Sequence, residues 1–403
     1  MGKRIIVVNT FFSPLGGAEV IAYNTYKILK KHGYEVYFWA CNKEPFFEKS
    51  YEYANDFTEY NSSLFNYFSW YYNSRAKKDF KEFISKVNPD IIHLHNFISY
   101  LSPSILDCCK DIPTIATLHD TSIICPAVTL QKNQHSFCTN VSCRSGKYYK
   151  CLINNCAKGG FEVNFRKTLR AYLVNKRLKY IDKFITPSNS LRTLILNSNI
   201  GIKQDQIVTI NNFLTEKQLK IVPNYKNEGY FLFVGRLSKE KGVHYLLEAM
   251  KDLPKDIKLK IAGSGTEENK LRQYAKENKL DNVEFLGFKN RDEIKELYQN
   301  CISTILPCNW FEIFGMTSIE SFINGKPVIA SEIGGIPEIV EDNINGLLFE
   351  PANIKQLQNC ILKYWNDANL IMKHGKNGYK KVVNYYNENC YYDKLIQTYK
   401  DLL

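Results

Sequence analysis

The chain has 403 residues, of which 44% are hydrophobic and 23% are charged, and its formal net charge is +12. This length predicts two domains, and the composition is that of a globular protein and not of a disordered or fibrous one. No apolar run approaches the ~18 residues that a membrane-spanning helix needs. The first residues have the pattern of a β-strand and not that of a signal peptide. We therefore expect a cytoplasmic protein.

The positive charge is concentrated in the first half of the chain. Residues 1–210 hold 27 Lys/Arg and 16 Asp/Glu, a net charge of +11, whereas the remainder has a net charge of +1. Residues 144–183 alone hold 11 basic and 2 acidic side chains. Such a basic face attracts anionic lipid, a phosphorylated substrate or nucleic acid, or it only keeps the protein soluble.

The first half alternates between strand-like and helix-like segments. The expected strands cover residues 3–12, 35–41, 90–95, 114–119, 183–187 and 207–211. Expected helices include 18–32, 102–110 and 164–180. This alternation predicts a parallel sheet with helices on both faces.

The alternating pattern weakens at 211–213 and in the polar run 222–229, where we expect a domain boundary. A second series follows, with expected strands at 230–234, 258–262, 283–286, 304–306, 328–331 and 347–349. Helices are expected between them, including 243–251 and 267–279, and again from residue 354 onward. Ligands of open parallel sheets bind beyond the carboxyl ends of the strands, so two such domains predict a cleft between these ends.

The most informative segment runs from Glu312 to Glu320. It follows an apolar strand pattern, and a helix is expected to begin near Gly315, where free N–H groups and the positive dipole end suit a phosphate. Glu320 would lie about one turn into this helix, and Glu312 on the loop before it. Spacing alone is equally consistent with two solvated glutamates on an ordinary strand–loop–helix unit.

Other expected strand ends carry residues suited to an anionic ligand. Arg236 and Lys241 follow the strand at 230–234, where an arginine fork and a lysine point charge suit a diphosphate, although a surface turn can have the same composition. His119, followed by an aspartate, ends the strand at 114–119, and His95 ends another. A strand-end histidine can bind phosphate or a sugar hydroxyl, or it can be a structural residue.

Two glycine-containing turns also lie at the ends of expected strands. Gly16 and Gly17 precede the first helix, and the run Gly334-Gly335-Ile336-Pro337-Glu338 follows the strand at 328–331. Both turns could let backbone amides approach a ligand, or they could be plain turns. A complete Gly-x-Gly-x-x-Gly is missing, because Glu268 stands where the third glycine after Gly263 would fall, and this disfavours an NAD-linked oxidoreductase.

Together and in this order, these motifs resemble retaining glycosyltransferase family 4, of the two-domain GT-B class. The resemblance spans about residues 4–385 and is most specific in the C-terminal block. It implies an α/β protein with two Rossmann-like, doubly wound domains that face each other across a cleft. The implied parts are an acceptor-binding domain at 1–212, a nucleotide-sugar-binding domain at 213–385 and a C-terminal helix at 386–403 that packs back on the first domain.

The resemblance also implies roles for individual residues. Arg236 and Lys241 would hold the diphosphate of the donor, together with backbone amides of Phe314 and Gly315. Glu320 would bind the ribose, and Glu312 would contact the donor sugar. The remaining donor-binding positions would be Gly16, Gly17, Phe288 and Ile313. His119 would reach the sugar from the first domain, and the expected catalytic set is Glu312, His119, Arg236 and Lys241.

A cysteine-rich insertion at about 121–160 resembles a branch of the family found among bacterial capsule and surface-polysaccharide transferases. Its last four cysteines have the spacing C-x4-C-x7-C-x4-C and are Cys138, Cys143, Cys151 and Cys156. Four thiolates can hold a structural zinc ion, although these spacings are wider than the usual two residues. Reduced packing cysteines and disulfides remain open as alternatives.

The resemblance thus predicts a retaining hexosyltransferase that needs no metal or other cofactor for catalysis. It would move a sugar from a nucleotide-diphosphate sugar, UDP favoured over GDP, to a saccharide or lipid-linked acceptor in cell-surface polysaccharide biosynthesis.

Basic and aromatic residues at 161–180, and a second such segment at 65–78, predict peripheral contact with the anionic inner face of the membrane. No nucleic-acid partner is expected, since no groove-reading motif is found. The alternatives are a nucleotide-sugar isomerase on a GT-B-like fold and a zinc-stabilised nucleic-acid-binding protein.

Overall fold

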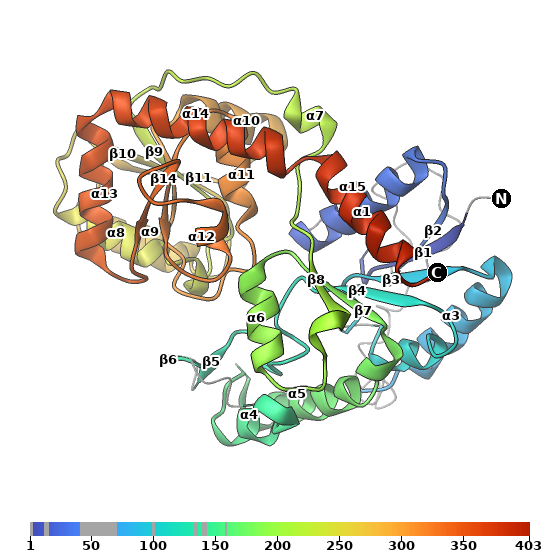
Figure 1. Cartoon of the computed structure of the whole chain (residues 1–403). Coiled ribbons are helices and arrows are strands. Elements are labelled where there is room, and N and C mark those ends of the chain that lie inside the picture. The colour runs from blue at the N-terminus through green and yellow to red at the C-terminus, as the bar shows by residue number, and fades with distance from the viewer. Residues whose placement is uncertain are drawn as a thin grey trace. The chain divides into compact units, whose positions relative to one another are not determined.

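The computed structural model describes residues 3–11, 16–40, 71–98, 101–132, 136–138, 143–157 and 159–403. The chain divides into two compact units, shown in Figure 1. Unit 1 comprises Met1–Asn211 with Tyr391–Leu403, and unit 2 comprises Asn212–Cys390. Among the described residues, no helix combines the length and apolar character needed to span a membrane. Residues 65–70 of the second predicted membrane segment lie outside the described residues.

Unit 1 is built on a six-stranded sheet with the order β2-β1-β3-β4-β7-β8. All its strand pairs are parallel. The strands are β1 (Arg4–Val8), β2 (Glu35–Trp39), β3 (Ile91–Leu94), β4 (Thr114–Thr117), β7 (Lys183–Thr186) and β8 (Ile207–Thr209). The central strands β1, β3 and β4 are buried along nearly their whole length, which explains why they read as continuous apolar runs.

The other elements of unit 1 surround this sheet. The α-helices are α1 (Gly17–Lys31), α3 (Ser74–Val87), α4 (Tyr149–Ile153), α5 (Gly160–Asn175), α6 (Asn189–Asn197) and α15 (Glu388–Lys400). Short 3-10 helices are η2 (Pro103–Cys108), η3 (Arg144–Gly146), η4 (Leu178–Tyr180) and η5 (Gln204–Gln206). A small antiparallel hairpin joins β5 (Gln131–Lys132) to β6 (Ser136–Phe137).

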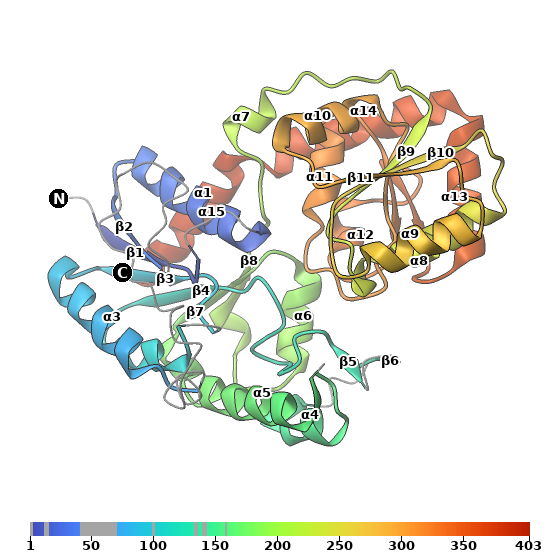
Figure 2. The ribbon, with the colours of Figure 1, turned by 180° about the vertical axis from the view of Figure 1, so that it is seen from behind.

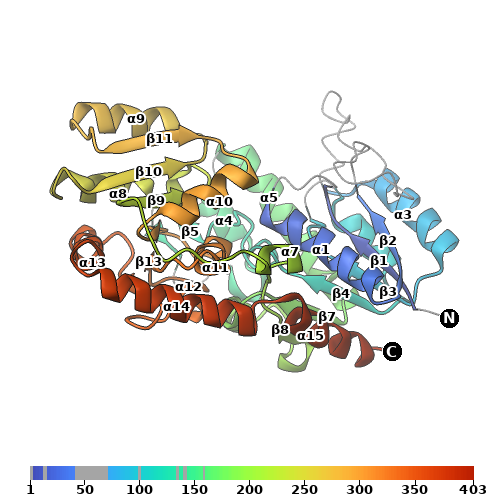
Figure 3. The same ribbon diagram turned by 90° about the horizontal axis from the view of Figure 1, so that it is seen from above.

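The C-terminal helix α15 packs on unit 1, as the fold class predicted. The hydroxyl of Tyr391 lies 2.8 Å from Oγ1 of Thr25 on α1, and the hydroxyl of Tyr399 lies 2.7 Å from Nδ1 of His93 on β3. Both tyrosines are buried. Figure 3 follows the chain, in red, from α14 of unit 2 into α15.

Unit 2 is built on a second six-stranded parallel sheet, with the order β11-β10-β9-β12-β13-β14. Its strands are β9 (Tyr230–Val234), β10 (Lys258–Ala262), β11 (Val283–Gly287), β12 (Thr304–Leu306), β13 (Val328–Ser331) and β14 (Gly346–Phe349). Its helices are α7 (Glu216–Leu219), η6 (Lys239–Lys241), α8 (Val243–Lys251), α9 (Glu268–Glu277), α10 (Arg291–Asn300), α11 (Met316–Ile323), α12 (Ile336–Ile339), α13 (Ile354–Asn366) and α14 (Ala368–Tyr385). Figure 2 shows α8 and α9 on the side of the sheet opposite to α10.

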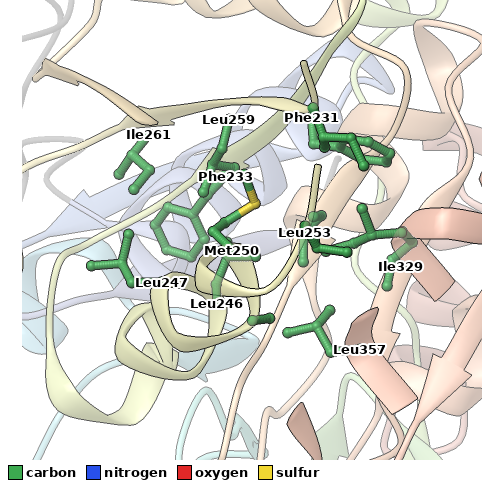
Figure 4. Close-up of a cluster of buried hydrophobic side chains, with 14 of the residues drawn as sticks. Phe231, Phe233, Leu246, Leu247, Met250, Leu253, Leu259, Ile261, Ile329 and Leu357 are labelled. Atoms are coloured by element: carbon green, nitrogen blue, oxygen red, sulfur yellow. The ribbon is translucent and has the colours of Figure 1, made fainter. Parts of the chain in front are cut away.

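The larger core of unit 2 fixes the strand and helix on either side of the predicted diphosphate loop. Phe231 and Phe233 of β9 pack with Leu246, Leu247 and Met250 of α8, as Figure 4 shows. Each of these side chains contributes about 1.5–3 kcal/mol when fully buried. The loop between β9 and α8, which carries Arg236 and Lys241, is therefore anchored at both ends.

Candidate active site

The strand order of unit 2 identifies where a ligand would bind. β9 lies beside β12, and the chain continues from these two strands in opposite directions, through β10 and β11 on one side and β13 and β14 on the other. In open parallel sheets, ligands bind beyond the carboxyl ends of the strands at such a switch point. The predicted residues Arg236 and Lys241 follow β9, and the segment from Glu312 to Glu320 follows β12. The fold thus brings the two most charged motifs to one edge of the sheet.

An ion pair joins these two motifs. Nζ of Lys241 lies 2.6 Å from Oε2 of Glu312, and both side chains are largely buried. Burial by itself disfavours the charged ammonium, but the neighbouring Glu312 carboxylate outweighs it and raises the pKa of Lys241. The thiol of Cys308 lies 3.7 Å from the same carboxylate oxygen, and burial raises the pKa of this thiol to about 12. Lys241 is therefore a fixed positive charge beside a neutral thiol.

Two glycines allow the backbones around this ion pair to approach closely. Gly242 has a φ of +71°, and a Cβ there would lie 1.8 Å from the carbonyl oxygen of Pro307. Gly334 has a φ of +61°, and a Cβ there would lie 2.1 Å from the carbonyl oxygen of Glu312. The amide of Gly335 donates to that same carbonyl at 2.7 Å. The Gly334-Gly335 turn therefore supports the backbone of Glu312.

The N-terminus of α11 has the properties expected of a phosphate site. Gly315 precedes the helix with a φ of +94°, and no side chain caps the first turn. Ser318 in that turn is fully buried, and its hydroxyl has no hydrogen-bond partner among the described residues. Buried hydroxyls are nearly always hydrogen-bonded, so an orphan at a helix N-terminus suits an anionic ligand. The Phe314 side chain is buried against Tyr386, which leaves only its backbone for a ligand.

Glu320 lies on α11, one turn further along. The hydroxyl of Tyr298, from α10, donates to Oε2 of Glu320 at 3.0 Å. Tyr298 is buried, and burial raises the pKa of Glu320. Because Tyr298 holds one oxygen of the Glu320 carboxylate, the other oxygen can accept hydrogen bonds from ribose hydroxyls.

Three further predicted residues are placed differently. The side chain of Arg236 is 71% exposed, and its guanidinium lies 3.4 Å from the Glu240 carboxylate, so it can turn toward an anion. Phe288 follows the edge strand β11, two strands away from β9, and is 80% exposed. Ile313 is half-buried between Glu312 and Phe314 in the chain.

His119 and the Gly16-Gly17 turn belong to unit 1. His119 follows β4, and its Nε2 lies 2.9 Å from Nδ1 of His95, which follows β3. Burial lowers the pKa of His119 to about 4 and that of His95 well below its usual value, so both imidazoles are neutral near neutral pH. Gly16 and Gly17 begin α1 after β1, and β1 and β3 flank the switch point of this sheet. Unit 1 therefore places its candidate residues after the neighbouring strands β1, β3 and β4.

Four residues near these sites were not assigned a role from sequence. Ser318 could have been found, since it lies in the first turn of the expected helix. His95 was noted as a strand-end histidine, but its contact with His119 depends on strand order. Cys308 and Tyr298 gave no signal, because only tertiary packing brings them to Glu312 and Glu320.

The cysteines of the insertion are at least partly buried in the structure. Cys143 and Cys151 are buried, and Cys138 and Cys156 are partly buried. Burial, with smaller effects from Cys125, Cys156 and Cys138, raises the pKa of Cys143 to about 12. No three His, Cys, Asp or Glu side chains are arranged to hold a metal ion in the part of the chain that the structure describes. Reduced packing cysteines match this arrangement, and the zinc site stays a prediction.

Comparison with known proteins identifies the family. Residues 15–217 match the model of Glycosyltransferase Family 4, and residues 215–381 match that of Glycosyl transferases group 1. An uncharacterized glycosyltransferase of Methanocaldococcus jannaschii is 26% identical, over 93% of this chain and 92% of that protein. The O-antigen chain mannosyltransferase C of Escherichia coli is 25% identical, over 85% of this chain and 83% of that protein.

A solved structure, that of Anabaena HepE in complex with UDP-glucose, aligns with a TM-score of 0.70 at 19% identity, over 99% of this chain and 100% of that one. None of these matches supports the isomerase or the nucleic-acid-binding alternative. The two parallel-sheet units have the predicted GT-B architecture. The chain therefore belongs to glycosyltransferase family 4, has the GT-B fold and is a glycosyltransferase.

Proposed function

We propose that the protein is a retaining, metal-independent hexosyltransferase that uses a nucleotide-diphosphate sugar, with a UDP-sugar favoured over a GDP-sugar. The acceptor is a saccharide or a lipid-linked saccharide of cell-surface polysaccharide biosynthesis, and the enzyme works in the cytoplasm. The observation that carries this proposal is the convergence of Lys241, Glu312 and the first turn of α11 at the switch point of unit 2.

In the proposed complex, the diphosphate lies at the N-terminus of α11. Arg236 and Lys241 neutralise its charge from the loop after β9, and the amides of Phe314 and Gly315 with the Ser318 hydroxyl donate hydrogen bonds. Glu320, oriented by Tyr298, accepts hydrogen bonds from the ribose. These positive groups stand where another enzyme could use a divalent ion, which supports metal independence.

The transfer step follows from where charge develops. The bond between the anomeric carbon of the sugar and the β-phosphate oxygen breaks, and its electron pair stays on the nucleoside diphosphate. The acceptor hydroxyl attacks from the face that the phosphate leaves, and its proton passes to a phosphate oxygen. Lys241 and the α11 amides stabilise the growing charge, and losing one such contact costs about 2–4 kcal/mol of barrier.

The choice of UDP and of a surface polysaccharide draws on the relatives. HepE was solved with UDP-glucose, and the Escherichia coli relative is named for the O-antigen chain. His119 and the Gly16-Gly17 turn are proposed to reach the sugar from unit 1. Phe288 and Ile313 complete the proposed donor set, Phe288 beside the base.

A thermal-shift panel with UDP, GDP, ADP and NAD tests the donor site and names the base. Ligand at about 100 times its Kd stabilises the fold by about 2.7 kcal/mol. The wild type is compared with Arg236→Ala and with the control Arg75→Ala. Both arginines are exposed, and each forms an ion pair with an acidic residue four positions later in the chain. We expect a shift with UDP that is lost only in Arg236→Ala. A protein that no nucleoside diphosphate stabilises contradicts the proposal.

Structural zinc on Cys138, Cys143, Cys151 and Cys156 is a separate proposal, supported by the spacing of these cysteines in the sequence. Metal analysis of protein purified without chelator tests it. Stoichiometric zinc, lost when Cys143 and Cys151 are changed to serine, supports the site, and metal-free folded protein ends the idea.

A further inference from the structure

Helix α5 exposes its aromatic side chains to solvent. Phe161, Phe165, Leu169 and Tyr172 are exposed, Phe161 by 74%. Their spacing of four, four and three residues places them on one face of the helix. Most globular proteins bury such a face, so this stripe needs an explanation.

The opposite, buried face of α5 is largely polar, which fixes the orientation of the helix. Asn164 is fully buried, and its amide nitrogen donates to the carbonyls of Ala157 and Gly160 at 2.9 and 2.8 Å. Its side-chain oxygen accepts from the amide of Ala157 at 2.8 Å. Turning the helix to bury the aromatic stripe would break the two hydrogen bonds between Asn164 and Ala157, which lies outside the helix, each worth about 0.5–1.5 kcal/mol. The stripe is therefore exposed in a rigid arrangement.

Helix α4 extends the exposed apolar surface. It packs against α5, and Figures 1 and 2 show the two helices side by side at the edge of unit 1. Tyr149 and Ile153, four residues apart, are both exposed, Ile153 by 73%. Six of the thirteen exposed large apolar side chains among the described residues thus lie in one segment of α4 and α5. We call this surface the α4–α5 face, formed by Tyr149, Ile153, Phe161, Phe165, Leu169 and Tyr172.

Basic side chains border the α4–α5 face. Lys147 precedes α4, and Lys176 and Lys179 follow α5, and all three are exposed. The one acidic side chain on α5, Glu162, forms an ion pair with Arg166. A surface with exposed aromatic side chains and a basic border is suited to binding an anionic bilayer. The aromatic rings would insert at the level of the lipid headgroups, and the lysines would bind the lipid phosphates.

We propose that the α4–α5 face docks the enzyme on an anionic lipid bilayer. A second copy of the chain fits this face less well, because a two-fold contact would bring its basic borders together. The proposal deepens the proposed use of a lipid-linked acceptor, and it concerns binding, so it can fail while the donor site stands.

Vesicle flotation of the full chain tests the proposal, with phosphatidylcholine vesicles that contain or lack phosphatidylglycerol. We expect binding at low salt that depends on phosphatidylglycerol and falls by about tenfold or more in the double variant Phe161→Ser, Phe165→Ser. The Lys176→Glu, Lys179→Glu variant should lose the preference for anionic vesicles. Met372→Ser with Tyr385→Ser, which changes exposed apolar side chains on α14, is the matched control and should bind as the wild type does.

Three outcomes would overturn the proposal. The wild type could ignore anionic vesicles, the two phenylalanines could prove dispensable, or the protein could form dimers that the double variant abolishes, which would make the face a contact between copies. An unchanged thermal shift with UDP in every variant shows that the fold and the donor site are intact, so a failed flotation then counts against docking alone.

Discussion

Nζ of Lys241 lies 2.6 Å from Oε2 of Glu312, so an ion pair joins the loop after β9 to the loop after β12. The two loops flank the switch point of unit 2, where the order of the strands in the sheet reverses. The pair holds the ammonium in position, and a donor phosphate that approached the first turn of α11 would find a cation already oriented. Preorganised charge of this kind costs no rearrangement during the reaction.

Changing Glu320 to glutamine should stabilise the protein while it weakens UDP binding. Burial raises the pKa of Glu320, so the folded protein binds this proton more tightly than the unfolded chain does. The contribution of Glu320 to stability is therefore complete at low pH and is lost as the pH rises through the folded pKa. We expect urea denaturation at pH 7 to show a more stable Glu320→Gln variant, with the difference shrinking toward pH 4. A variant less stable than the wild type at pH 7 would show that the carboxylate is needed for the fold.

Changing Gly334 to alanine should remove activity, because the new Cβ would lie 2.1 Å from the carbonyl oxygen of Glu312. Gly33→Ala is the matched control, since its φ of +84° is also positive and no atom lies within 4 Å of the Cβ position. The control should lose about 1–2 kcal/mol through backbone strain alone. We expect a larger loss of stability and of kcat/KM for Gly334→Ala, measured by denaturation and donor turnover. Equal effects of the two changes would contradict the supporting role of Gly334.

Stability should fall as the pH is lowered from about 6.5 to about 4. Burial lowers the pKa of His119 to about 4, whereas an unfolded histidine titrates near 6.5. Between these values the unfolded chain binds more protons, so stability is lost as the pH falls, on the order of 2 kcal/mol for this residue. His119→Asn should flatten that part of the pH profile. Parallel profiles for the wild type and His119→Asn would place His119 in a solvated environment.

Changing His95 to phenylalanine should impair transfer without weakening UDP binding. The variant removes the hydrogen bond between His95 and His119 and so frees the His119 ring. A lost hydrogen bond of about 1 kcal/mol predicts a fall in kcat/KM of about fivefold. UDP binding should persist, because its proposed contacts lie in unit 2. His95→Asn, which keeps a donor, should recover part of the rate, and a change in UDP affinity would argue against this role.

The sequence predicted the fold well because the strands of the two six-stranded sheets are parallel and most of them are buried. Residues 5–8 of β1 and all of β9 (Tyr230–Val234) are continuous apolar runs, and helices such as α8 and α9 bury one face only. The 102–110 segment was expected to be a helix and is the 3-10 helix Pro103–Cys108, which Ser102 caps at its start. Helix α5 begins at Gly160, earlier than predicted, because the left-handed Gly159 precedes its first turn.

The sequence located the charged residues of the candidate site but not their supports. Arg236, Lys241, Glu312 and Glu320 follow strands, a position that pattern alone reveals. Tyr298 and Cys308 gain their roles from packing between elements, which no local pattern reports. The Gly334-Gly335 turn was interpreted either as a close approach to a ligand or as a plain turn, and in the structure it contacts the backbone of Glu312.

Calorimetric titration of UDP into the wild type, Lys241→Met and Lys381→Met tests the central claim most directly. Lys381 is a matched control, because its Nζ lies 2.6 Å from Oε1 of Glu341 in the same unit, and it belongs to α14 and not to the loops after β9 and β12. A charged hydrogen bond of about 1.5–3 kcal/mol predicts binding weaker by about tenfold to a hundredfold in Lys241→Met, with Lys381→Met unchanged. Equal affinity in all three proteins would contradict the placement of the donor diphosphate at Lys241.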